Sequence, residues 1–182
     1  MTTYEQYKSK SVFNDKQMRQ IRLGFENGLS ARQIEIYAQI EFDYGKMEQI
    51  RNGFEERLTE KEIAMYAKPE FNSFQTEQIR KGLKHLGITI DQVAIYAKPE
   101  FHFMQMQQMF KGFAKGLTIE QVKLYAKPEF SWLQMRQIRH GFYTSLTIEQ
   151  VRRYAKVKID ASLMLDKRLR LLKRMQKEVT NT

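Results

Sequence analysis

The chain has 182 residues, of which 42% are hydrophobic, and a formal net charge of +10. It contains no cysteine, which excludes disulfides and thiolate metal sites and favours a reducing, cytoplasmic compartment. No apolar run reaches the length of about 18 residues that a membrane span needs, and the polar N-terminal residues do not resemble a secretory signal. The excess of basic residues favours polyanions or acidic proteins as partners.

Residues 1–11 are polar and are predicted to form a flexible leader. A tandem repeat follows, marked by a Tyr-Ala pair that recurs at spacings of 29, 30, 29 and 29 residues. The five repeats span residues 12–40, 41–69, 70–99, 100–128 and 129–157. Self-similarity with this period indicates an array in which each unit buries its apolar face against its neighbours.

The first half of each repeat has the pattern of an amphipathic helix. In the fourth repeat, apolar residues follow one another at spacings of three and four between Met106 and Leu117. Good N-cap residues precede this helix in four repeats, at Asn14, Asp43, Asn72 and Ser131. His102 holds the same position in the fourth repeat and is the exception to the pattern.

The second half of each repeat predicts a shorter helix of about nine residues, which ends at the Tyr-Ala pair. A Ser or Thr with Gln or Glu three residues later forms a capping box at the start of each, at Ser30, Thr59, Thr89, Thr118 and Thr147. Pro69, Pro99 and Pro128 then prevent further helix. We therefore predict an all-α fold, an α-solenoid of five two-helix repeats, with residues 158–182 forming a basic amphipathic C-terminal capping helix.

A glycine recurs late in each first helix, at Gly24, Gly53, Gly82, Gly112 and Gly141. Glycine inside a helix costs about 1 kcal/mol relative to alanine, so we interpret it as a site of close helix packing rather than of ligand contact. The repeated phenylalanines are interpreted as core wedges rather than base-stacking platforms, and the tyrosines as half-buried residues.

Charge is distributed unevenly along the array. Residues 12–69 have a net charge of −1, residues 70–157 of +6 and residues 158–182 of +4. Local basic density is typical of nucleic-acid binding, although an acidic protein surface or, less well, an anionic membrane would respond to the same field. The candidate binding residues are Arg80, Lys111, Lys115, Lys123, Arg139, Arg152, Arg153, Lys167, Arg170, Arg174 and Lys177.

Residues suited to catalysis or metal binding do not form a recognisable set. The repeated carboxylates Glu41, Glu70, Glu100 and Glu129 occur once per repeat, whereas paired acid/base work needs two carboxyls within about 5–10 Å. The three histidines stand at different positions of the repeat and have no cysteine partner. We expect no enzymatic activity, metal, cofactor or small-molecule substrate.

Two segments carry a resemblance to a known group of proteins. The octet from Met135 to Phe142, MRQIRHGF, and the hexamer from Tyr125 to Phe130, YAKPEF, resemble the tandem unit of short helical-repeat proteins of phages and conjugative elements in Gram-positive bacteria. The resemblance covers residues 12–157 and implies a mobile-element setting, in which inhibitors of host defence nucleases, including anti-CRISPR proteins, are expected. It implies no catalytic or binding residue.

Together these observations favour a non-enzymatic helical scaffold that binds nucleic acid or a nucleoprotein complex through its basic C-terminal half. The alternative is a protein-interaction module of a mobile element, whose target is a defence or transfer protein. The two interpretations merge if that target is an RNA-guided nuclease.

Overall fold

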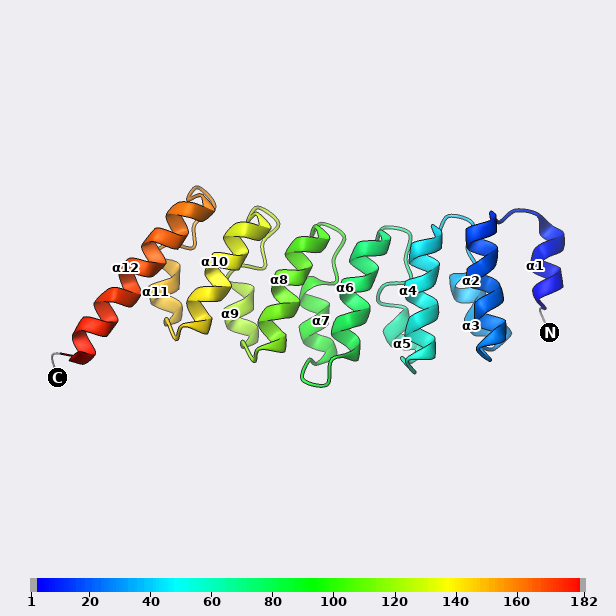
Figure 1. The fold of residues 1–182 in the computed structure, drawn as a ribbon, viewed down its shortest axis with the longest axis horizontal. Helices are drawn as coiled ribbons and strands as arrows, with labels where there is room; N and C mark the ends of the chain where they lie inside the picture. Colours follow the sequence, from blue (N-terminus) through cyan, green and yellow to red (C-terminus); the bar gives the residue numbers. More distant parts are fainter. Residues whose placement is uncertain (1–2, 181–182) are drawn as a thin grey trace. The chain divides into compact units, whose positions relative to one another are not determined.

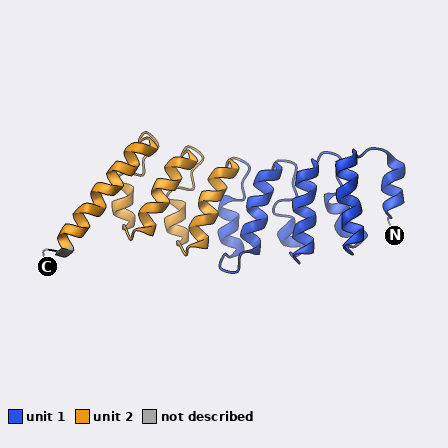
Figure 2. Ribbon diagram, in the orientation of Figure 1, with its two compact units in different colours: residues 1–99 blue, residues 100–182 orange. Residues whose placement is uncertain are grey.

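A computed structural model describes residues 3–180 of the chain. This part of the chain forms twelve helices and no strand (Figure 1), which confirms the all-α prediction. The helices group into two compact units, residues 1–99 and residues 100–182 (Figure 2). The boundary between the units falls where the third predicted repeat ends. None of the helices described is both long enough and apolar enough to cross a membrane.

Unit 1 alternates long and short helices after the N-terminal α1 (Tyr4–Lys10). The long helices are α2 (Asp15–Glu26), α4 (Tyr44–Glu55) and α6 (Ser73–Lys84), and α4 packs against both of the others. The short helices α3 (Ala31–Tyr37), α5 (Glu60–Ile63) and α7 (Ile90–Tyr96) each pack against the long helix that precedes them.

Unit 2 has the same alternation. Its long helices are α8 (Phe103–Ala114), α10 (Trp132–Tyr143) and α12 (Ala161–Thr180), and α10 packs against α8 and α12. The short helices α9 (Ile119–Lys123) and α11 (Ile148–Arg152) pack against α8 and α10, respectively. The basic C-terminal segment is therefore a helix packed on the last repeat, and the sixth long helix in the series.

The predicted start signals are confirmed at the atomic level. All five short helices begin with the expected capping box. His102, expected to break the pattern, also caps its helix, because its Nδ1 accepts a hydrogen bond from the Met104 N–H at 3.3 Å. The short helices contain four to seven residues rather than about nine. In α5, α9 and α11 the last turn tightens to i→i−3 bonds, such as Tyr154 N–H to Val151 C=O, which end the α-helix early.

The repeated glycines and tyrosines meet at one point in each repeat. The five tyrosines of the Tyr-Ala pairs are fully buried, not half-buried as expected, and each lies against the glycine of its own repeat. A Cβ at Gly141 would lie only 2.0 Å from Tyr154 Oη, and one at Gly112 2.2 Å from Tyr125 Oη. The close-packing interpretation of the glycine is therefore confirmed, as is the core position of the repeated phenylalanines.

The glutamine of the first capping box also ties each repeat to the loop that follows it. Gln134 Nε2, for example, donates to the backbone oxygens of Val157 and Ile159 at 2.8 and 2.7 Å. Lys46 replaces this glutamine in the second repeat, and its Nζ donates to the Lys68 carbonyl at 2.9 Å. Burial lowers the pKa of Lys46, and nearby carboxylates oppose that shift. The sequence pattern had indicated only the capping role.

The N-terminal leader differs from its prediction. Residues 4–10 form α1 instead of a flexible segment, and Gln6 Oε1 accepts the Thr3 N–H at its start, 2.9 Å away. Tyr7 is 4% exposed and packs against Phe13 and Phe25, with ring centroids 6.0 and 6.3 Å apart. One buried aromatic side chain is enough to dock this otherwise polar segment. The first two residues of the predicted leader lie outside the part described.

Candidate functional site

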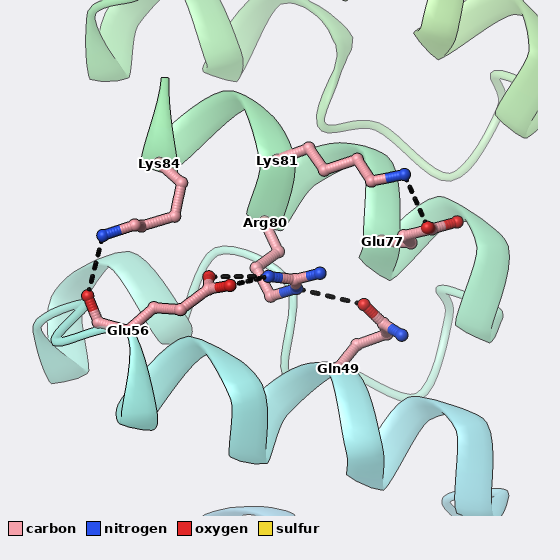
Figure 3. Close-up of polar contacts among 6 residues, drawn as sticks. All are labelled: Gln49, Glu56, Glu77, Arg80, Lys81 and Lys84. Atoms are coloured by element: carbon pink, nitrogen blue, oxygen red, sulfur yellow. Dashed lines mark hydrogen bonds and ion pairs between the residues drawn. The ribbon is translucent and has the colours of Figure 1, made fainter. Parts of the chain in front are cut away.

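Arg80 and Arg139, two of the predicted binding residues, connect helices inside their units. Arg80 of α6 donates from Nη1 to both carboxylate oxygens of Glu56, at 2.5 and 2.6 Å, and from Nε to Gln49 Oε1 at 3.0 Å (Figure 3). Its side chain is 12% exposed. Figure 3 also shows Lys84 donating to the Glu56 carbonyl at 3.0 Å. The Nε and Nη1 groups of Arg80 are therefore already hydrogen-bonded within unit 1.

Arg139 is placed in the same way in unit 2. Its Nε and Nη2 lie 3.3 and 3.1 Å from Gln108 Oε1 on α8, and its guanidinium stacks over Tyr143 at 4.9 Å from the ring centroid. The residue is 7% exposed. The guanidinium groups of Arg80 and Arg139 are thus engaged within the chain, so we leave both out of the candidate site, and their assignment to a binding surface stays a prediction.

These arginines belong to a series of interhelix hydrogen bonds that sequence reasoning missed. A glutamine on one long helix accepts from an arginine 31 residues later, in the pairs Gln20–Arg51, Gln49–Arg80, Gln108–Arg139 and Gln137–Arg168. The signal was present as a glutamine and an arginine at constant places in the repeat. Charge alone does not show where a side chain points, so the sequence does not reveal these pairs as contacts between helices.

Lys111, Lys115 and Lys123 are exposed side chains at the ends of α8 and α9. Lys111 Nζ donates to Gln107 Oε1 at 3.0 Å on the same helix. Arg152 ends α11, and Lys177 lies in the last turn of α12; both are also exposed. The structure places these five residues on the surface, and none of them lines the hollow described next.

The remaining four predicted residues do come together. Arg153, Lys167, Arg170 and Arg174 line a hollow of about 230 Å³ beside α12, together with Tyr154 and Leu171. We call this hollow the basic groove. Arg153 follows α11, and the other three cations stand on α12 at spacings of three and four residues, so helix geometry directs them to one face.

The groove lies beside α12, the long helix that follows the fifth repeat. Like the earlier long helices, α12 begins at an acidic or polar cap, Asp160, whose Oδ1 accepts the Leu163 N–H at 2.9 Å. This bond and one from the Ser162 hydroxyl lower the pKa of Asp160. Four residues after the cap, Met164 is fully buried.

Two of the residues that line the groove differ in kind from their counterparts in α10. In α10 the corresponding places are held by Ile138 and Gly141, and a Cβ on Gly141 would meet Val151 and Tyr154 of the following short helix. In α12 they are held by Lys167 and Arg170. Cations therefore replace an apolar residue and the glycine that lies against the short helix in the preceding repeat.

The electrostatics of the groove are one-sided. Arg170 Nη2 lies 3.3 Å from Asp166 Oδ2, but both side chains are more than half exposed, so the pair neutralises little. Within the described residues, no salt bridge joins Arg153, Lys167 or Arg174 to a carboxylate. Guanidinium groups donate in a planar fork that matches phosphate oxygens. The groove thus has the donors and the charge for a phosphate-bearing ligand.

A larger hollow in unit 1 lacks this character. It has a volume of about 570 Å³ and is lined by residues including Tyr4, Phe25 and Leu29. Its one cation, Arg32, pairs with Glu60 at 2.8 Å. The net charge of the lining therefore distinguishes the basic groove from this apolar hollow.

His140 of α10 lies near the arginines of unit 2 but adds little positive charge. Burial lowers its pKa first, and the positive charges of Arg139, Arg168 and Arg136 lower it further. The imidazole is therefore neutral at pH 7. In the part of the chain described, no three His, Asp or Glu side chains are grouped so that they could hold a metal ion.

Comparison of the chain with models of known families finds no match, and comparisons with curated proteins and with solved structures find no match either.

Proposed function

We propose that this protein is a non-enzymatic helical-repeat scaffold that binds nucleic acid through the basic groove. In this proposal the five two-helix repeats form an α-solenoid, and α12 caps it while supplying most of the binding residues. The observation that carries the proposal is the replacement of the Ile and Gly of α10 by Lys167 and Arg170 at positions of α12 that line the basic groove. Solubility alone does not require cations to line a hollow.

The groove would bind nucleic acid through contacts between its cations and the phosphate groups. Arg153 and Arg174 supply guanidinium forks, Lys167 a compact ammonium, and the surrounding net charge of α12 attracts a polyanion. Tyr154 is fully buried beneath the groove and offers no face for base stacking. Binding would therefore be dominated by the backbone phosphates and would show little sequence preference.

The resemblance to repeat proteins of phages and conjugative elements supports the proposal that this nucleic-acid binding serves a mobile element. In that setting the bound nucleic acid would belong to a nucleoprotein complex, such as an RNA-guided nuclease of the host. This extension depends on the resemblance alone and is part of the proposal.

Fluorescence anisotropy with a labelled, mixed-sequence single-stranded DNA, titrated at several salt concentrations, tests the proposal. The double variant Arg153→Glu/Arg174→Glu removes two phosphate contacts and adds two repulsive charges. We expect it to weaken binding by about tenfold or more and to reduce the slope of log K against log salt by about 1.4.

The matched control is Lys115→Glu/Lys123→Glu, which changes the net charge equally on exposed residues outside the groove. It should leave the affinity within about threefold of the wild-type value, because distant surface charges are screened. Equal losses in the two double variants would show that binding follows overall charge. Full binding by the groove variant would refute the assignment of the site.

A further inference from the structure

The face of α12 opposite the basic groove carries a stripe of leucines. Leu165, Leu169 and Leu172 follow one another at spacings of four and three, the seam pattern of helices that pair with other helices. Leu165 and Leu169 are 37% and 43% exposed, and Leu172 is half-buried. An amphipathic surface helix normally turns such a stripe inward, whereas this one leaves it open.

The leucine stripe is not needed to attach α12 to its unit. Met164, which is fully buried, and Arg168, which donates to Gln137 Oε1 at 3.3 Å, stand on the attached side. At the places of Leu165 and Leu169, the preceding helix α10 has Arg136 and His140. The preceding long helix thus has a cation and an imidazole where α12 has these two leucines.

The net charge of α12 indicates which kind of helix would bind to this stripe. Between Ala161 and Thr180, α12 carries six basic and two acidic side chains. A second copy of α12 would bring the same net charge of +4 and be repelled, whereas a helix with acidic flanks would be attracted. We propose that the leucine stripe docks an acidic amphipathic helix of a partner protein, with its apolar side chains against Leu165, Leu169 and Leu172.

The two faces of α12 can be occupied at the same time. Successive helix residues are about 100° apart, so Lys167, Arg170 and Arg174 lie about half a turn away from the leucine stripe. Nucleic acid in the basic groove would not cover the leucines. The inference is thus independent of the proposed function and would survive its failure.

Binding to a synthetic helix provides the test. The probe is a labelled peptide of about three heptads with Leu at the seam and Glu at the flanking positions, compared with the same peptide carrying Lys for Glu. We expect saturable binding of the Glu peptide to the full-length protein, and none of the Lys peptide. Leu165→Gln/Leu169→Gln should weaken Glu-peptide binding roughly tenfold or more, because these side chains would form the apolar centre of the interface.

The matched control is Ile90→Gln/Ile119→Gln, which removes two apolar side chains that are 40% and 37% exposed on short helices. It should bind the Glu peptide like the wild type, and both variants should keep the wild-type circular dichroism spectrum. Absent or leucine-independent binding of the Glu peptide would overturn the proposal. A leucine-dependent dimer in sedimentation analysis, or leucine-dependent binding to phosphatidylserine vesicles without peptide binding, would assign the stripe to another occupant and also overturn it.

Discussion

Substitution of Gly141 by alanine adds one methyl group where the side chains of Tyr154 and Val151 lie against α10. The new Cβ would lie 2.0 Å from Tyr154 Oη and 3.2 Å from Val151 Cγ2, whereas an ordinary contact is about 3.5 Å or longer. Tyr154 is fully buried, so its ring cannot move aside without disturbing its neighbours. The two helices must therefore separate.

The expected cost follows from two opposing terms. Alanine favours the helix by about 1 kcal/mol over glycine, and overpacking of a buried site costs about 1–3 kcal/mol. A distance of 2.0 Å places the overpacking cost at this site near the upper end of that range. After the gain in helix propensity is subtracted, the net destabilisation is about 2 kcal/mol. For a chain of this size, that corresponds to a fall in Tm of about 4–8 °C.

Removal of the tyrosine hydroxyl should rescue the variant. Tyr154→Phe alone loses a long hydrogen bond of 3.4 Å to the Gln137 carbonyl, which contributes about 0.5–1.5 kcal/mol at most. In the double variant with Gly141→Ala, the Oη that causes the clash is absent, so we expect a favourable coupling of about 1–2 kcal/mol. Thermal and urea unfolding followed by circular dichroism measures all four proteins. A Gly141→Ala protein as stable as the wild type, or one that Tyr154→Phe does not rescue, would refute the close-approach argument.

Three further predictions concern stability. Arg139→Met should destabilise unit 2 by about 1–3 kcal/mol, because it leaves buried Gln108 without its donor, yet the folded variant should bind DNA like the wild type in anisotropy titrations. Thr147→Ala should cost about 1 kcal/mol in urea unfolding by removing the cap that accepts the Gln150 N–H at 3.2 Å. His140 has a lowered pKa in the folded state, so the unfolded chain binds more protons and stability should decline as pH falls below about 6.5. His140→Gln should reduce this decline between pH 7.5 and 5.5, and an unchanged pH dependence would contradict the assignment.

The helices were predictable from the sequence because their start signals are local. A capping box uses side chains three residues apart, and its geometry depends little on the rest of the fold. Thr118 with Gln121 illustrates this in α9, where both hydrogen bonds form as expected. The glycine–tyrosine contact was predicted in part: the recurrence of glycine indicated close packing, but the side chain that approaches it was identified only by the structure.

The sequence predicted that basic residues would form the candidate site, but not which of them lie together. Charge counting located the basic residues in the C-terminal half, but it grouped Arg80 and Arg139 with Arg153 and Arg174. The first two arginines are held by glutamines 31 residues earlier, and the last two line a hollow. All four have the same charge in the sequence, so only their neighbours in space separate connecting arginines from candidate ligands.

The sequence by itself determined where most helices begin, which residues recur in the core and that the positive charge increases toward the C-terminus. These properties depend on neighbours within about one helical turn or on simple composition. The tertiary structure decided which arginines form hydrogen bonds between packed helices. It also decided that the buried side chain of Tyr7 docks α1. It also decided that α12 leaves a cation-lined groove on one face and exposed leucines on the other. Those outcomes depend on contacts between residues far apart in the chain, for which a single sequence carries no local signal.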